Sequence, residues 1–272
     1  MRHILLLPLF VIACISCSQT SQQSPSNNSI KLSPAPVVTD SLGPSGDSTS
    51  NQFITRPKDI LLTSYPDHRL ITVFRLNSMG GKSYYDKASG RNGNSFYLGS
   101  TYRYHNYPGK LKEHDNAWHG HYLPGLEAIY GYNMYNLRHY HVKTGEGRDF
   151  FSQPVLINTV YYPAHLPDTL NGSPIQRDYY FVSVYDQDTN GDSLINKKDL
   201  RHFYHFDIGV TQRRLLLPAN YSVRSSQYDI ENDFLYLFAS LDENQDGEIQ
   251  VEEAVHSFII DLANPGKVDR AY

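Results

Sequence analysis

Two stretches lying 54 positions apart decide the fold: Tyr180-Phe181-Val182-Ser183-Val184-Tyr185 and Phe234-Leu235-Tyr236-Leu237-Phe238-Ala239. Aromatic and β-branched residues dominate the first stretch without helix punctuation, which predicts a strand. The same offset continues without a gap, because His202-Phe203-Tyr204-His205-Phe206-Asp207 corresponds to His256-Ser257-Phe258-Ile259-Ile260-Asp261. The chain therefore contains an internal repeat built from strands.

A period of about 50 residues with several strands per copy is typical of propeller blades or of a stacked β-meander. We predict a mainly β fold made of repeated, blade-like meanders with short helical turns. The region from about residue 65 has room for at most four copies. This leaves open an incomplete propeller or a sandwich. Strands that end in an acidic residue before a turn, such as those ending at Asp207 and Asp261, resemble the outer strands of TolB-type propellers.

Each copy carries an acidic loop between its strands. The loop at 242–253 reads Asp242-Glu243-Asn244-Gln245-Asp246-Gly247-Glu248-Ile249-Gln250-Val251-Glu252-Glu253 and matches the EF-hand calcium loop at every defining position. Calcium prefers six to eight oxygen ligands, which a loop of this length can supply. The predicted ligands are Asp242, Asn244, Asp246, the carbonyl of Glu248, Gln250 and Glu253. The alternative is a solvated acidic turn.

A second loop at 188–199 has the same spacing. Its predicted calcium ligands are Asp188, Asn190, Asp192, the carbonyl of Leu194, Asn196 and Asp199, with Asp186 as a candidate extra ligand. Ser193 replaces the glycine of the sharp turn, which costs about 1 kcal/mol if that residue must adopt a positive φ. Asp199 replaces the longer Glu, as in the loops of dockerins, which this stretch resembles. We expect calcium to bind here more weakly than at 242–253.

The N-terminal region is predicted to be a signal peptide followed by a disordered tether. Residues 1–16 have a short basic start and an apolar core, as in a lipoprotein signal peptide. Val11-Ile12-Ala13-Cys14 resembles a bacterial lipobox, whose cysteine carries acyl chains such as palmitate; Cys17 and an ordinary cleaved signal are the alternatives. Residues 17–52 are rich in Ser, Gln, Asn, Thr and Pro, which predicts a disordered tether before a β domain at 53–272.

Composition excludes several classes of function. The chain has 24 Lys and Arg against 28 Asp and Glu, for a net charge of −4, which argues against nucleic-acid binding. Both cysteines precede residue 18, so the predicted β domain has no disulfide and no thiolate nucleophile. No nucleophile elbow, zinc-protease motif or nucleotide-binding loop occurs in a fitting context. We therefore expect no enzymatic activity.

Two further clusters leave alternatives open. His114, His119 and His121, together with the spaced pair His139 and His141, suit zinc or copper, which would indicate a metal-dependent hydrolase. The 22 tyrosines, with Trp118, form either a β core or an aromatic face for a glycan or peptide partner.

Taken together, the lipobox and the calcium loops resemble EF-hand-containing envelope lipoproteins of the Bacteroidota. The resemblance implies attachment to the membrane through an N-terminal lipid. Because no Asp follows Cys14 or Cys17, it also implies delivery to the outer membrane of the cell envelope. We expect a calcium-binding, non-enzymatic lipoprotein in which calcium stabilises the β repeat, with a binding or scaffold role.

Overall fold

A computed structural model describes residues 55–79, 95–98, 101–104 and 123–272. The predicted signal peptide (1–16), the predicted tether (17–52) and both cysteines lie outside these residues. The strands are β1 (Thr55–Leu62), β2 (His68–Met79), β3 (Ser95–Leu98), β4 (Thr101–Tyr104), β5 (Leu126–His141), β6 (Gly147–Asp149), β7 (Leu156–Pro163), β8 (Asp168–Leu170), β9 (Ser173–Ile175), β10 (Tyr179–Tyr185), β11 (His202–Asp207), β12 (Arg213–Leu215), β13 (Tyr221–Asp229), β14 (Phe234–Leu241), β15 (Val255–Asp261) and β16 (Val268–Arg270).

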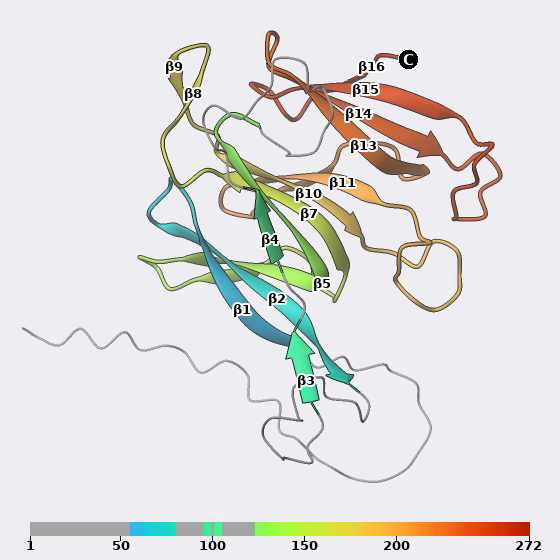
Figure 1. The fold of residues 1–272 in the computed structure, drawn as a ribbon, viewed down its shortest axis with the longest axis horizontal. Coiled ribbons are helices and arrows are strands. Elements are labelled where there is room, and N and C mark those ends of the chain that lie inside the picture. Colours follow the sequence, from blue (N-terminus) through green and yellow to red (C-terminus); the bar gives the residue numbers. More distant parts are fainter. Residues whose placement is uncertain (1–54, 80–94, 99–100, 105–122) are drawn as a thin grey trace, which may run out of the picture. The chain divides into compact units, whose positions relative to one another are not determined.

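These strands form antiparallel sheets, drawn in Figure 1. The largest sheet has the order β1-β2-β5-β7-β10-β11-β12, and β3, β4 and β6 pair at its sides with β2 or β5. A second sheet has the order β13-β14-β15-β16, and β8 pairs with β9 alone. The described part of the chain contains no helix, so the mainly β class is confirmed and the predicted short helical turns are wrong there. Each acidic loop ends instead with a short turn, at 197–198 or 251–252, that lies two or three residues before the next strand.

Strand β10 is buried along its whole length because both of its faces are covered. Tyr180, Val182 and Val184 face a core that also contains Phe150, Phe151 and residues of β1 and β2. Tyr179 and Phe181 face a second core that the 10-stranded sheet shares with β13, β14 and β15. A strand buried on both faces has no need for polar alternation. This explains the nearly continuous run of aromatic and β-branched residues from Tyr179 to Tyr185.

The repeat places equivalent strands in the two sheets. Strands β10, β11 and β12 occupy the positions that β14, β15 and β16 occupy 54 residues later. The pairing differs by one residue, since Tyr179 lies opposite Asp207 whereas Phe234, the counterpart of Tyr180, lies opposite Asp261. Each copy is therefore a meander whose first two strands are joined by an acidic loop.

Candidate metal centre

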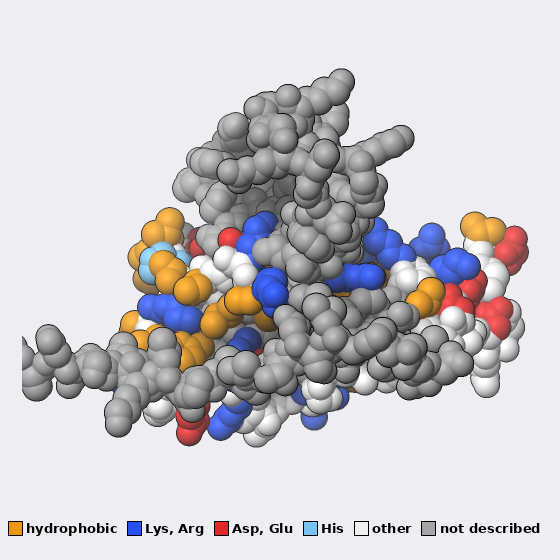
Figure 2. Space-filling model, turned by 90° about the horizontal axis from the view of Figure 1, so that it is seen from below, with side chains coloured by type: hydrophobic (Ala, Val, Ile, Leu, Met, Phe, Trp, Pro, Cys, Tyr) orange, Lys and Arg blue, Asp and Glu red, His pale blue; other side chains and the backbone are white. Residues whose placement is uncertain are grey.

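Both acidic loops connect neighbouring antiparallel strands. Loop 188–199 follows β10 and precedes β11, and loop 242–253 follows β14 and precedes β15. Figure 1 shows the two loops at the same end of their sheets, on the right of the view. The prediction that strands rather than helices flank both loops is confirmed. In Figure 2, acidic side chains gather at the same end of the molecule.

In loop 242–253, the first and last carboxylates hold the main chain. Asp242 Oδ2 accepts a hydrogen bond from the N–H of Gly247 at 3.0 Å. The two oxygens of Glu253 accept from the N–H groups of Glu243 at 3.0 Å and Gln250 at 2.9 Å. Because these acceptors lie at positions 1 and 12, their bonds close the loop upon itself. These bonds are all local in the sequence.

The middle of the same loop is organised around Asp246. Its N–H donates to Asn244 Oδ1 at 3.0 Å, and its own Oδ1 accepts from the N–H of Glu248 at 3.0 Å. That bond from Glu248 lowers the pKa of the Asp246 carboxyl below its ordinary value. The side-chain amides of Asn244 and Gln250 both lie 2.9 Å from Asp246 Oδ2. Four predicted ligand residues therefore converge on one side of the loop.

Loop 188–199 makes the same closing hydrogen bonds despite its different sequence. Asp188 Oδ2 accepts from the N–H of Ser193 at 2.8 Å. The oxygens of Asp199 accept from the N–H groups of Thr189 at 2.8 Å and Asn196 at 2.7 Å. These bonds correspond one for one to those of Asp242 and Glu253. The shorter acid at position 12 therefore still closes the loop.

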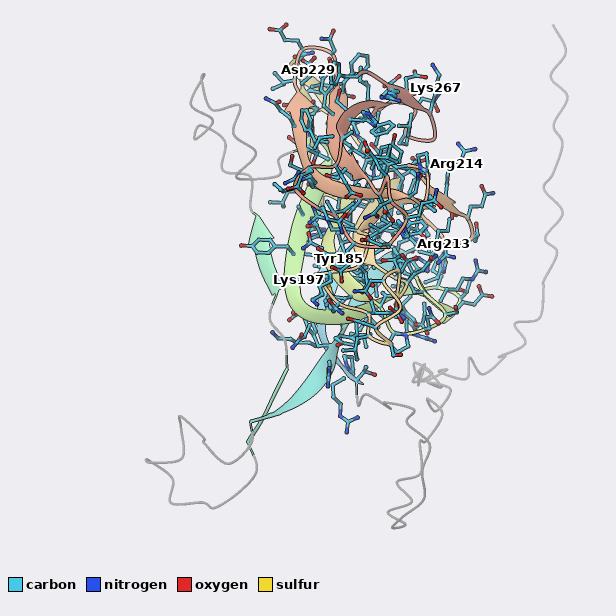
Figure 3. All side chains as sticks on the ribbon, turned by 90° about the vertical axis from the view of Figure 1, so that its right-hand side faces the viewer. Tyr185, Lys197, Arg213, Arg214, Asp229 and Lys267 are labelled. Carbon is cyan, nitrogen blue, oxygen red and sulfur yellow. The ribbon has the colours of Figure 1, made fainter. Side chains whose placement is uncertain are left out.

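The middle of loop 188–199 repeats the arrangement around Asp246. Asp192 donates its N–H to Asn190 Oδ1 at 3.1 Å and accepts from the N–H of Leu194 at 2.9 Å. The amide of Asn196 donates to Asp192 Oδ2 at 3.2 Å. Figure 3 labels Lys197, which follows this set, and Tyr185, the last residue of β10. The two loops thus share a main-chain path as well as a spacing of acids.

The sixth position of each loop has a left-handed backbone. Gly247 has a φ of 79° and Ser193 a φ of 67°. Glycine adopts this conformation at no steric cost, whereas a residue with a Cβ atom is strained by about 1–2 kcal/mol. Ser193 therefore does adopt a positive φ, and the backbone strain at this residue destabilises loop 188–199.

Among the acids of the two loops, Asp242 has a carboxylate oxygen that is buried and lacks a hydrogen-bond partner. It is 4% exposed, and its Oδ1 is buried without a hydrogen-bond partner. By contrast, Asp199 is equally buried but both of its oxygens accept hydrogen bonds. Leaving a buried acceptor unpaired costs about 1–3 kcal/mol, and more when the group is charged. A cation at this oxygen would remove that cost.

The donor set fits calcium better than a transition metal. Within residues 55–79 and 123–272, no three His, Cys, Asp or Glu side chains converge closely enough to hold a metal ion by themselves. An EF-type site does not need such a cluster, because amide, main-chain and carboxylate oxygens share the coordination. Asn244, Gln250 and the carbonyl of Glu248 are oxygen donors of this kind.

The two loops also contact each other. Thr189 Oγ1 donates to the carbonyl of Gly247 at 2.7 Å, and Asn190 Nδ2 donates to Glu248 Oε1 at 2.7 Å. A Cβ atom on Gly247 would lie 1.9 Å from the carbonyl oxygen of Thr189. Sequence reasoning missed this contact, because it joins two different sheets and nothing in either loop marks the partner. One loop from each sheet is therefore built against the other.

Asp186, the candidate extra ligand of loop 188–199, is held by two side chains of β11. His202 Nδ1 lies 2.6 Å from one of its oxygens, and the hydroxyl of Tyr204 donates to the other at 2.7 Å. Burial raises the pKa of Asp186, but these hydrogen bonds outweigh it and leave the pKa below its ordinary value. The second nitrogen of His202 lies 3.1 Å from the carbonyl of Ala219, so both neighbours of this ring are acceptors, and both are satisfied when the ring is protonated.

Among the described residues, His139 and His141 form a cluster with His68. His114, His119 and His121 lie outside the described residues, as does Trp118. The pairing of β2 with β5 brings His139 and His141 to His68, which sequence reasoning did not select. His139 Nε2 lies 2.8 Å from His68 Nδ1, and the ring centres of His68 and His141 are 5.1 Å apart. Burial, followed by the charges of these neighbours, lowers the pKa of His139 to about 4.

Comparisons with known proteins do not assign this chain to a family. No protein-family model matches this chain, and a search of curated proteins finds no significant match. Within its described residues the chain has no helix that is both long and apolar enough to span a membrane.

Proposed function

We propose that this protein is a calcium-binding lipoprotein of the cell envelope in which two EF-type loops stabilise a β repeat domain. The observation that carries the proposal is the buried, unpartnered Oδ1 of Asp242. It belongs to a loop whose closing hydrogen bonds are reproduced in loop 188–199. A repeated loop geometry with an unsatisfied anionic oxygen supports a function in binding a cation.

The chemistry of the donors favours calcium. All side-chain donors at the predicted ligand positions are carboxylate or amide oxygens, which suit a hard cation that takes six to eight oxygen ligands. In loop 242–253 these would be Asp242, Asn244, Asp246, the carbonyl of Glu248, Gln250 and Glu253. In loop 188–199 they would be Asp188, Asn190, Asp192, the carbonyl of Leu194, Asn196 and Asp199.

The proposed role of calcium is structural. Binding only to the folded state adds about 2.7 kcal/mol of stability at a hundredfold excess over the dissociation constant. The contacts of Thr189 with Gly247 and of Asn190 with Glu248 link the loops of two sheets. An ion that fixes either loop therefore also supports the contact between the sheets.

We further propose that the repeat unit is a blade-like meander. The candidate units are β7-β10-β11-β12 and β13-β14-β15-β16, each a run of neighbouring antiparallel strands. The first of these continues through β5 into the larger sheet, whereas the second stands as a separate sheet. In this proposal each unit carries one calcium loop, between its second and third strands.

The proposed location is the outer membrane, reached through an acyl chain on Cys14 or Cys17. Metabolic labelling with a palmitate analogue would test this part separately. Labelling lost in Cys14→Ala and kept in Cys17→Ala would support Cys14, and the reverse would support Cys17. Labelling kept in the double variant would contradict the lipid anchor, while leaving calcium binding untouched.

A calorimetric calcium titration of the purified protein tests the function itself. We expect two ions to bind, one of them lost in Asp242→Asn and the other in Asp188→Asn. A chelator should lower the melting temperature, and less so in each variant. Glu252→Gln is the matched control, because Glu252 lies in the same loop at an exposed position without a ligand role. Identical melting curves with and without chelator would reject the proposal.

A further inference from the structure

A cavity of about 390 Å³, lined by both apolar and polar side chains, lies between the 10-stranded sheet and β13. Four of its lining residues form one row across neighbouring strands: Tyr130 of β5, Thr159 of β7, Ser183 of β10 and Phe203 of β11. Pockets of about 300–1,000 Å³ are typical of small-molecule sites. The cavity is large enough for a ligand the size of one sugar ring.

The polar residues of this row interrupt an apolar face. The next row on the same face contains Ala128, Tyr161 and Phe181, which belong to the core shared with the second sheet. Thr159 and Ser183 are also buried, at 9% and 6% exposure. Within the described residues, no side-chain hydrogen bond is made by Ser183. A hydroxyl that lines a cavity without such a bond adds nothing to core packing, but it is suited to pair with a ligand.

Arg201 brings a positive charge to the cavity. Its Nε donates to the carbonyl of Val223 at 2.6 Å, and its Nη2 donates to the carbonyl of Arg224 at 2.6 Å. Its Nη1 donates to Asn158 Oδ1 at 3.2 Å. The β-bulge between Val223 and Ser225 brings the two carbonyls to the guanidinium. The side chain is therefore held in place by neutral oxygens alone.

This charge has no acidic counterpart. Among the described residues, no Asp or Glu lines the cavity, and the second charged residue that does is Arg224. Burial lowers the pKa of Arg201 below its ordinary value, while the nearby Tyr185 acts in the opposite direction. Arg201 is half-buried, so its charge is only partly hydrated while its hydrogen-bond partners are neutral. A ligand carboxylate would supply the missing charge, and guanidinium groups recognise carboxylates well.

We infer that this cavity binds a small hydroxylated carboxylic acid, of the size and class of a hexuronate. The carboxylate lies toward Arg201 and Arg224, and the sugar hydroxyls pair with Thr159, Ser183 and Asn158. The rings of Tyr130 and Phe203 provide apolar contact for the C–H groups of the sugar. This site uses none of the calcium loops and does not depend on the function proposed for them.

The test is a titration of the intact protein with galacturonate, with neutral galactose as the matched ligand and sulfate as the inorganic anion. We expect galacturonate to bind at least about tenfold more tightly than galactose, with an affinity that falls as salt rises. Ser183→Ala should weaken binding about two- to tenfold, as expected for one lost hydrogen bond. Arg224→Gln should weaken it at least about fivefold. Both variants avoid Arg201, whose loss could unfold the protein.

The control variant is Arg214→Gln, which makes the same change of charge at an exposed residue that does not line the cavity. Figure 3 labels Arg214, on β12. It should leave galacturonate binding unchanged. Galactose binding as tightly as galacturonate would overturn the inference, as would sulfate competing equally well. Absence of binding at about 10 mM ligand, or unchanged affinity in both cavity variants, would also overturn it.

Discussion

At the scale of single residues, Gly247 has two reasons to be glycine. Its φ of 79° disfavours a Cβ atom, and such an atom would lie 1.9 Å from the carbonyl oxygen of Thr189. Gly247→Ala should therefore lower the free energy of unfolding by about 2–4 kcal/mol, since left-handed strain adds to a backbone clash. Urea unfolding in the presence of calcium measures this change.

A substitution at Gly191 separates the effect of left-handed backbone strain from the effect of the steric clash. This residue occupies position 4 of loop 188–199 with a φ of 72°, but a Cβ atom there would meet nothing within 4 Å. Gly191→Ala should cost only the strain, about 1–2 kcal/mol. If both variants lose the same stability, the contact between the loops carries no energetic weight.

Sequence patterns predict only part of the structure at the level of single residues. The spacing of the acids predicts which residues face the middle of each loop, because both loops are closed by local hydrogen bonds such as those of Asp188 and Asp242. The same patterns cannot show that Gly247 packs against Thr189, 58 positions away. That contact depends on how two sheets meet, and no periodicity in the chain encodes it.

At the scale of elements, a single buried arginine links segments far apart in the chain. Arg177 lies just before β10 and is 4% exposed. It forms two hydrogen bonds with the carboxylate of Asp233, at 2.7 and 2.8 Å, in the turn between β13 and β14. Its other donors reach the carbonyls of Leu262 at 2.6 Å and Pro124 at 3.0 Å.

Removing this side chain should destabilise the protein strongly. Arg177→Met should cost about 3–5 kcal/mol in urea unfolding, because it removes the buried bidentate partner of the half-buried Asp233 carboxylate and one donor from each of two carbonyls. Adding Asp233→Asn should recover part of that loss. In contrast, Arg138→Met breaks an exposed pair with Asp149 and should cost less than about 1 kcal/mol. Equal losses in Arg177→Met and Arg138→Met would contradict this account.

Four strands of the repeat were predictable at this scale, but their connections across sheets were not. Strand propensity and the 54-residue offset predict β10, β11, β14 and β15, because both signals are local. Arg177 offers no such signal, since an arginine before a strand is ordinary in sequence. The cavity at Arg201 is hidden for the same reason, because its lining comes from five strands that only the fold brings together.

At the scale of the whole molecule, two histidines give stability opposite dependences on pH. His202 is held by Asp186 and the carbonyl of Ala219, and although burial lowers its pKa, these bonds leave the pKa above its ordinary value. Its contribution to stability is therefore complete below the unfolded pKa of about 6.5 and is lost as pH rises through the folded pKa. His139 behaves in the reverse way, because its folded pKa is only about 4.

The loss of stability at acidic pH that His139 causes should be visible in unfolding experiments. Between pH 6.5 and 4 the unfolded chain takes up a proton at His139 that the folded protein resists, so stability falls with pH. This residue alone should lower the free energy of unfolding by about 2 kcal/mol between pH 7.5 and 5. Protonating both rings would place two donors face to face at the 2.8 Å contact of His139 with His68, beside the charges of His141 and Arg148. His139→Gln should flatten the slope, whereas His202→Gln should leave it in place. An unchanged slope in His139→Gln would show that other groups cause the acid loss.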